Sequence, residues 1–279
     1  MFEIALVTPV KNEIDNLPRF LKALKDSEVV INTLIIVEND SDDGSKEYLE
    51  KITELDNVKF FHLLEKKFEN KEYSIGFKYS EIINYGFDYL KNLDTFDDIS
   101  YVGILDSDCF IEPNYYSQLA NSFQEIDGLG ITCGIIKFDD GKIEKVNKDQ
   151  VRGTGRLWSK ECFLEMGDYY GLSPDSISMV KARLSGYEVQ LTENAFMYSR
   201  PVNSRGDKSF RGRSAYYNGV PFSFILMKSI ACLFVDISMS KGLIKGYFLQ
   251  RKSRVINPDK AVLQYNRSRL RRRIKHMFR

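Results

Sequence analysis

The chain has 279 residues, of which 43% are hydrophobic and 28% are charged. This composition excludes an intrinsically disordered chain, and the length suffices for one large domain or for a domain with an appendage. The four cysteines are far apart and form no CxxC pair, which excludes a zinc knuckle and a dense disulfide framework. We expect free thiols in a reducing cytoplasm, because Met1 leads directly into an apolar run and not into a signal sequence.

The net charge of +1 conceals two regions of opposite sign. Residues 1–199 carry 21 Lys or Arg and 36 Asp or Glu, a net charge of −15. Residues 200–279 carry 19 Lys or Arg and 3 Asp, a net charge of +16. We therefore expect the two regions to face different partners.

The first hundred residues alternate short apolar runs with stretches at helical spacing. This order is typical of βαβ units and predicts a largely parallel sheet. The expected strands are residues 2–7, 33–37, 58–62 and 99–105, and the expected helices lie at about 17–24, 48–52 and 76–90. Polar loops follow the first, second and fourth strands, so they meet at the carboxyl edge of the sheet, where ligands bind.

The pattern changes after residue 110 and predicts a mixed sheet. The expected elements are a helix at 113–123, a strand at 131–138, a hairpin turn at 139–142, a glycine-punctuated loop at 152–156, helices at 159–166 and 175–184, and a strand at 187–191. From residue 213 the chain is basic and helical. Its apolar run 220–235 is interrupted by Lys228, so it is too short for a membrane span of ~20 residues.

Asp106 and Asp108 stand one residue apart, directly after the apolar run 99–105. Two carboxylates at the rim of a sheet suit a divalent cation that lies between protein oxygens and the phosphates of a substrate. The alternative is a solvated turn in which an Asp caps the next helix. Taken alone, the triplet favours the turn, and other segments must decide.

Five segments around this triplet occur in an order that resembles a known family. They are TPVKNE (8–13), ENDSDDGS (38–45), Gly76 with NYG (84–86), LDSD (105–108), and GLSPD (171–175) followed by Lys181 and GYEV (186–189). Together they resemble the GT-A glycosyltransferases of family 2, over about residues 2–200. The resemblance implies a Rossmann-like, mixed and mostly parallel α/β sheet flanked by helices. It also implies a catalytic domain at 1–212, with a nucleotide-binding half at about 1–110 and an acceptor half at about 111–212, before a basic helical extension at 213–279.

The resemblance also implies roles for single residues. Asp108 would bind the metal, Mn²⁺ or Mg²⁺, and Asp106 would contact the ribose or the sugar. Asp175 would be the catalytic base of an inverting transfer, although helix capping also explains an Asp at that place. The remaining expected contacts to the nucleotide sugar are Thr8, Pro9, Val10, Glu13, Asn39, Gly76 and Ser107.

The chain departs from the family pattern at three places. Many relatives have a His after the strand that follows the base helix, whereas residues 195–200 read AFMYSR. A metal with fewer protein ligands would depend more on the donor diphosphate, which suits Mg²⁺ or Mn²⁺. Asn39 stands where many relatives place an Asp toward the base, and Pro174 stands at a position that is often acidic.

The expected partners are a UDP-, GDP- or dTDP-linked sugar donor and a glycan or lipid-linked acceptor. The extension resembles that of some family 2 enzymes of surface-polysaccharide assembly, and its basic and apolar residues suit an anionic membrane on the cytoplasmic side. Its arginines would alternatively form a solvated helix face, bind nucleic acid without specificity, or pair with the acidic region of another copy. We expect no specific nucleic-acid partner.

Two other functions remain open at this point. A sugar-nucleotide nucleotidyltransferase normally has a glycine-rich loop after its first strand, and residues 8–13 contain no glycine. A non-catalytic nucleotide-binding or scaffold protein is opposed by the presence of Asp106, Asp108 and Asp175. We interpret Trp158 as a core residue in preference to a surface on which a sugar stacks. We interpret residues 42–44 as a turn whose polar groups cap the next helix.

Overall fold

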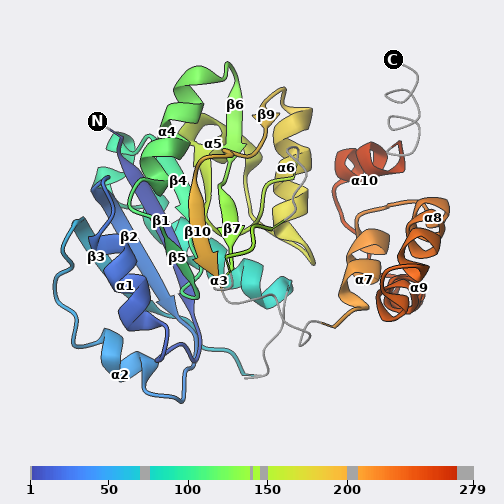
Figure 1. Cartoon of the computed structure of the whole chain (residues 1–279), viewed down its shortest axis with the longest axis horizontal. Helices are drawn as coiled ribbons and strands as arrows, with labels where there is room; N and C mark the ends of the chain where they lie inside the picture. Colours follow the sequence, from blue (N-terminus) through green and yellow to red (C-terminus); the bar gives the residue numbers. More distant parts are fainter. Residues whose placement is uncertain (1, 70–75, 139–140, 145–149, 200–206, 269–279) are drawn as a thin grey trace. The chain divides into compact units, whose positions relative to one another are not determined.

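We describe the protein from a computed structural model, which describes residues 2–69, 76–138, 141–144, 150–199 and 207–268. The chain divides into two compact units (Figure 1). The first comprises residues 1–170 and 174–201, and the second comprises residues 171–173 and 202–279. The boundary expected at residue 212 falls inside a helix of the second unit.

The first unit is built on a seven-stranded sheet with the order β3-β2-β1-β4-β8-β6-β9. In this order the strands are Val58–Glu65, Ile31–Glu38, Ile4–Val10, Tyr101–Ile104, Arg156–Ser159, Leu129–Thr132 and Glu188–Val189. The first four are parallel to one another, and β8 runs antiparallel between β4 and β6. The expected mostly parallel, mixed α/β sheet is therefore confirmed.

Helices cover both faces of this sheet, so its central strands are buried on both sides. Successive side chains of β1 point to opposite faces, and Val7 shares one core with Phe87, whereas Leu6 shares the other with Phe20. Figure 1 shows α1 crossing one face of the sheet beside β1 and β2. The helices are α1 (Leu17–Lys25), α2 (Ser45–Leu49), α3 (Phe77–Lys91), the 3-10 helix η1 (Asp94–Asp98), α4 (Tyr115–Glu125), α5 (Lys160–Met166) and α6 (Pro174–Leu184).

The single strand expected at residues 131–138 is wrong. The segment forms the end of β6 and a separate strand, β7 (Ile135–Lys137), which belongs to a second sheet with β5 (Cys109–Ile111) and β10 (Phe196–Ser199). The chain changes sheets at Gly134, where a Cβ would lie only 2.3 Å from the carbonyl oxygen of Ala195. Tyr115 accepts a hydrogen bond from the amide of Gly134 at 2.8 Å, which fixes the bend.

Strand β1 extends three residues beyond the expected end and includes Thr8, Pro9 and Val10. Its ladder with β4 continues as far as Val7, whose carbonyl accepts from the amide of Leu105 at 3.2 Å. Two residues later Pro9 has no amide hydrogen with which to continue the ladder. The chain after Leu105 is thereby released from the sheet, and the residues released are those of the Asp106–Asp108 triplet.

Three smaller expectations are confirmed. Trp158 is fully buried and meets Phe87 edge to face, with 6.0 Å between the ring centroids. The four cysteines are free. In the capped turn, Asp43 accepts a hydrogen bond from the amide of Ser45 at 2.9 Å, and Gly44 has the left-handed φ of 94°. In the hairpin turn at 139–142, residues 139–140 lie outside the described part of the chain.

The second unit contains helices α7 (Phe210–Tyr217), α8 (Phe222–Leu233), α9 (Ile237–Ser253) and α10 (Lys260–Arg267). Its small core consists of Val220, Phe224, Ile225, Leu243 and Tyr247. Helices α7 and α9 pack closely, since a Cβ at Gly246 would lie 1.9 Å from the carbonyl oxygen of Ser209. Within the described ranges, no helix has the length and apolar character that crossing a bilayer requires.

The short segment 171–173 belongs to the second unit, although it directly precedes α6 in the chain. The hydroxyl of Ser173 accepts hydrogen bonds from Ser214 at 2.7 Å and from the side-chain amide of Asn218 at 2.6 Å. Asn218 in turn accepts from Asn257 at 3.1 Å. A chain of polar side chains therefore holds Ser173 within the second unit.

Candidate active site

Asp106 is presented at the carboxyl end of β4, where its main chain and side chain are both held. Its amide donates to the hydroxyl of Thr154 at 2.9 Å, and the hydroxyl of Tyr79 on α3 donates to its Oδ1 at 2.8 Å. Burial and the nearby charge of Asp108 raise the pKa of Asp106 to about 7. An additional positive charge at this edge of the sheet would favour the ionised carboxylate.

Asp108 lies one residue further, where the chain enters β5. Its Oδ1 lies 3.6 Å from the Sγ of Cys109. Across the small sheet Cys109 pairs with Ser199 of β10, which lies in the stretch where many relatives have a His. In the part of the chain that the structure describes, no group of three or more His, Cys, Asp or Glu forms a complete metal site.

The donor atoms at this edge nevertheless suit a hard divalent cation. Asp106 and Asp108 offer carboxylate oxygens and raise each other's energy when both are ionised, as the pKa of Asp106 indicates. A cation held by these two residues would need further oxygen ligands. The phosphates of a nucleoside diphosphate are ligands of that kind.

Unpartnered polar atoms lie at the ends of β1 and β2. Thr8 is fully buried and Asn39 is 7% exposed. The hydroxyl of Thr8 and the Oδ1 of Asn39 make no hydrogen bond within the described residues. A buried polar atom without a partner costs about 1–3 kcal/mol, so a ligand that bonds to these two atoms would recover free energy.

The loops that follow β1 and β2 are bound to each other. The amide of Asn12 donates to the hydroxyl of Ser41 at 3.0 Å, and its side chain donates to Asp42 at 2.8 Å. The amide of Glu13 donates to the hydroxyl of Ser45 at 2.9 Å. The two loops therefore form one wall, and the residues expected to contact the nucleoside stand on a fixed support.

Asp175 stands in the first turn of α6 and is partly exposed. Its carbonyl oxygen accepts from Ser178 at 2.9 Å, whereas its carboxylate makes no hydrogen bond within the described residues. The side chain therefore forms no capping hydrogen bond with the described residues, although its charge lies in the first turn of α6, where the helix dipole favours a carboxylate.

Tyr79, which is partly buried, and Tyr169, which is buried, connect the surroundings of Asp106 and Asp175. The pKa values of the Tyr79 and Tyr169 hydroxyls are raised, first by burial and further by the charges of Asp106 and Asp175. The hydroxyl of Tyr169 has no hydrogen-bond partner among the described residues. Asn84 fixes the backbone of Tyr169 by donating to its carbonyl at 2.7 Å and accepting from its amide at 2.9 Å.

The glycine-punctuated loop joins the same two carboxylates. Thr154 bonds to the amide of Asp106, and a Cβ at Gly153 would lie 3.5 Å from the Cβ of Asp175 and 3.5 Å from the hydroxyl oxygen of Tyr169. The loop is therefore more than a tight turn, because it lies against both carboxylate-bearing segments.

Sequence reasoning missed Arg156, the first residue of β8. Its side chain is fully buried and opposes Ile104 of β4 in the strand register. The guanidinium donates to the carbonyl oxygens of Asp175 at 3.2 Å and Val151 at 3.0 Å, and its centre lies 5.1 Å from the ring of Trp158. Arg156 thus holds the first turn of α6 to the glycine-punctuated loop. A charged residue directly before the apolar pair Leu-Trp was the only signal for it.

The other expected site residues lie along the same edge. The hydroxyl of Ser107 donates to the carbonyl of Pro9 at 3.2 Å, which joins the triplet to the end of β1. Val10 is buried, and its carbonyl accepts from the amide of Asn39 at 2.9 Å. Gly76 is the N-cap of α3, the helix that carries Tyr79 to Asp106. The segment 70–75 before it lies outside the described residues.

Comparison with known proteins decides among the open functions. The family model of glycosyl transferase family 2 matches residues 5–184. The chain belongs to this family. This membership makes it a glycosyltransferase and removes the nucleotidyltransferase alternative. No curated protein sequence matches the chain significantly.

Solved structures support the GT-A fold. The mannosyltransferase PcManGT from Pyrobaculum calidifontis, in complex with GDP-Man and Mn²⁺, is similar with a TM-score of 0.58 and 13% identity, over 90% of this chain and 88% of that chain. S. aureus TarS 1–349 in complex with UDP-GlcNAc is similar with a TM-score of 0.54 and 14% identity, over 91% and 74% of the two chains. Against the longer TarS structure, at 13% identity and a TM-score of 0.54, the chain covers 44% of that chain's length.

Proposed function

We propose that this glycosyltransferase is inverting and metal-dependent, and that it moves a sugar from a nucleoside diphosphate to a glycan or lipid-linked glycan. The observation that carries the proposal is that the glycine-punctuated loop lies against both carboxylate-bearing segments: Thr154 bonds to the amide of Asp106, and Gly153 lies against Asp175 and Tyr169. A donor anchor and an unbonded carboxylate on neighbouring segments are what a direct displacement requires.

In the proposed reaction, the hydroxyl oxygen of the acceptor forms a bond to the anomeric carbon while the bond from that carbon to the diphosphate breaks. Asp175 accepts the proton of the attacking hydroxyl and later releases it to water. The bonding pair of the broken bond leaves with the nucleoside diphosphate. Because the hydroxyl enters opposite the leaving group, the anomeric configuration is inverted.

We assign the metal to Asp108, with Asp106 beside it on the ribose or sugar. When bound, Mn²⁺ or Mg²⁺ supplies positive charge that stabilises the diphosphate as it leaves. Tyr79 and Thr154 hold Asp106 in place, and Ser107 ties the triplet to β1. The protein ligands are few, so metal and donor should bind cooperatively.

For the nucleoside end we propose contacts with Thr8, Pro9, Val10, Glu13 and Asn39. The unpartnered Oδ1 of Asn39 and hydroxyl of Thr8 are the polar atoms that a base and a ribose would satisfy. Asn39 presents an amide where a carboxylate is common, so we leave UDP, GDP and dTDP as the donors to be compared. Gly76 completes the proposed nucleotide-sugar contacts at the N-terminus of α3.

For the acceptor we propose a glycan that is carried on a lipid at the cytoplasmic membrane surface. The support is the positive charge of the C-terminal region, which suits an anionic leaflet. The arginine cluster at 267–273 lies almost wholly outside the described residues. A cytoplasmic, peripheral enzyme in surface-polysaccharide assembly would combine these features.

The decisive experiment is a thermal-shift screen of UDP, GDP and dTDP and their sugars, each with and without Mn²⁺, followed by a transfer assay with the stabilising donor. We expect one base to raise the melting temperature, and to do so more strongly with Mn²⁺. NMR of the product then reports the anomeric configuration. Absence of nucleoside diphosphate binding in calorimetry, together with absence of donor hydrolysis and transfer, would refute the proposal.

A further inference from the structure

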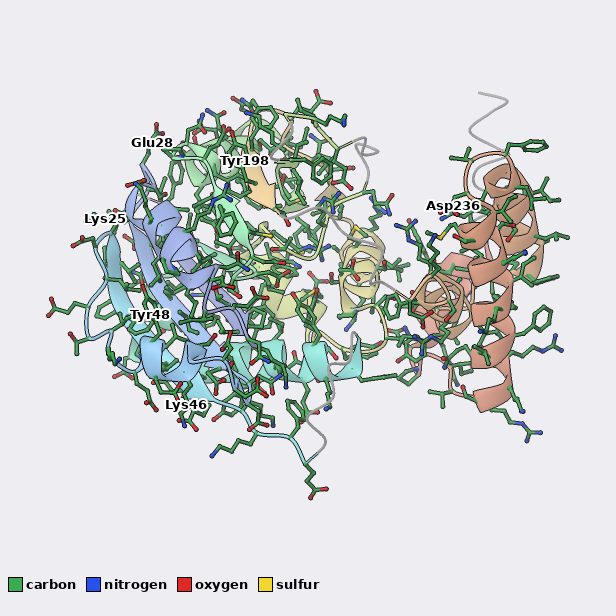
Figure 2. All side chains as sticks on the ribbon, turned by 60° about the horizontal axis from the view of Figure 1, so that its bottom comes forward. Lys25, Glu28, Lys46, Tyr48, Tyr198 and Asp236 are labelled. Atoms are coloured by element: carbon green, nitrogen blue, oxygen red, sulfur yellow. The ribbon has the colours of Figure 1, made fainter. Side chains whose placement is uncertain are left out.

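The α8–α9 hairpin of the second unit exposes large apolar side chains. The exposed residues are Leu226, Met227, Ile230 and Leu233 on α8, Phe234 and Val235 in the turn, and Ile237, Phe248 and Leu249 on α9. Phe234 and Val235 are each 89% exposed, whereas among the described residues of the first unit no large apolar side chain is more than 52% exposed. Asp236, labelled in Figure 2, marks this turn on the ribbon.

The exposed residues of α8 fall on one side of the helix. Leu226, Ile230 and Leu233 are spaced by four and three residues, while Phe224, Ile225 and Ser229 are buried toward the core. The stripe continues into the turn. An apolar surface of this size on a charged protein indicates an interaction site.

The charges around the stripe are almost all positive. Residues 210–258 contain eight Lys or Arg and a single acidic residue, Asp236. That carboxylate caps α9 through the amide of Met239 at 3.0 Å and pairs with Lys208 at 3.3 Å. Lys241 and Lys245 are exposed on α9 at a spacing that places them on the same side as Ile237 and Phe248.

We infer that the α8–α9 turn is a membrane wedge: Phe234 and Val235 insert into the interface of an anionic bilayer while Lys241 and Lys245 bind its headgroups. Exposed apolar residues beside lysines, with a single acidic residue that already pairs with Lys208, match an interfacial helix. The twelve residues of α8 extend for about 18 Å, less than the ~30 Å core of a bilayer, so the hairpin lies in the interface.

This inference rests on the proposed function for its purpose, which is access to a lipid-linked acceptor. It goes further in naming the turn, and not the basic C-terminus alone, as the part that enters the membrane. The occupant is a lipid surface because the charges of residues 210–258 are almost all positive, which suits anionic headgroups. A second copy that covers the stripe is the competing occupant.

The test uses the full chain with vesicles of phosphatidylcholine alone and of phosphatidylcholine mixed with phosphatidylglycerol. We expect sedimentation with the mixed vesicles only. Phe234→Ser with Val235→Ser should lower the partition coefficient about ten-fold or more, and Lys241→Ser or Lys245→Ser about five-fold each. Phe60→Ser, which removes an exposed phenylalanine of the first unit, is the matched control and should leave the partition unchanged.

A Phe234→Trp variant provides a second measurement. The native Trp158 is fully buried, so its emission forms a constant background. The emission at position 234 should shift to the blue with mixed vesicles, and bromine-labelled lipids should quench it. A Phe60→Trp control should show neither effect.

Unchanged vesicle binding by the double variant would overturn the wedge, and so would an absence of any vesicle binding. Self-association that disappears in the double variant would identify a second copy as the occupant and would also overturn it. Calorimetry with the nucleoside diphosphate and Mn²⁺ on the same proteins keeps the two proposals distinguishable. Wild-type protein that binds the nucleoside diphosphate normally but binds no vesicles refutes the wedge alone. Wild-type protein that binds vesicles but no nucleoside diphosphate refutes the proposed donor chemistry alone.

Discussion

The two units differ in which side chains they bury and which they expose. The first unit buries polar atoms that lack partners, such as those of Thr8, Asn39 and Tyr169, while its large apolar residues are mostly inside. The second unit has a core of few residues and leaves Phe234 and Val235 in solvent. Buried polar atoms without partners suit a small polar ligand, and exposed apolar surface suits an extended partner.

The largest expected effect tests whether the candidate active site of the first unit is catalytic. Asp175→Asn removes the proposed base, so kcat should fall about 10²–10⁴-fold. Calorimetric affinity for the nucleoside diphosphate should stay the same, because Asp175 contributes to proton transfer and not to donor binding. Asp168→Asn, at an exposed position of the preceding loop, is the control. Transfer at the normal rate by Asp175→Asn would contradict the assignment of the base.

The next effect contrasts a buried arginine of the first unit with an exposed one of the second. Arg156→Met removes the guanidinium donors to the carbonyls of Val151 and Asp175, of which Asp175 keeps the hydroxyl of Ser178, so the free energy of unfolding should fall by about 2–4 kcal/mol. Arg211→Met should change it by less than about 0.5 kcal/mol, since Arg211 is exposed. Urea unfolding measures both. Equal stabilities would show that Arg156 does not hold α6.

The pH dependence of stability should reveal the cost of ionising Asp106 in the folded protein. Its pKa is about 7 in the folded protein, above the ~3.9 of an unfolded chain. Between these values the folded state binds the additional proton, so the metal-free protein should lose stability, by about 1–3 kcal/mol, as the pH rises. Asp106→Asn should remove this slope. An identical slope in wild type and variant, measured by urea unfolding, would assign the titration to other groups.

The smallest expected effect tests whether the buried hydroxyl of Thr8 contacts a ligand or has no role in binding. Thr8→Val removes an unpartnered oxygen and keeps the shape, so the unfolding free energy should rise by about 1 kcal/mol. If the hydroxyl binds the nucleoside, calorimetric affinity for the diphosphate should fall about five-fold at the same time. Higher stability without loss of affinity would remove Thr8 from the site. Val58→Ile is a control at a half-buried apolar position.

Patterns within short segments were sufficient for part of this picture. The alternation of apolar runs and helical spacing predicted the parallel strands β1 to β4, because the strands inside the sheet are buried on both faces, while the edge strand β3 is only partly buried. The carboxylates of Asp106 and Asp108 could be placed at the sheet edge, since they follow the apolar run of β4 directly. The five segments together predicted the family, which the match to residues 5–184 confirmed.

The sequence by itself thus determined the fold class, the place of the candidate site residues Asp106 and Asp108 after β4, and the opposite charges of the two regions. Only the tertiary structure decided which polar groups meet. Arg156 reaches Ser178, and Asn84 fixes Tyr169, across 22 and 85 residues of chain. The split at Gly134 and the exposure of Phe234 likewise depend on what packs against them. Periodicity records which face of a local element is apolar, whereas a contact between distant elements leaves no local pattern.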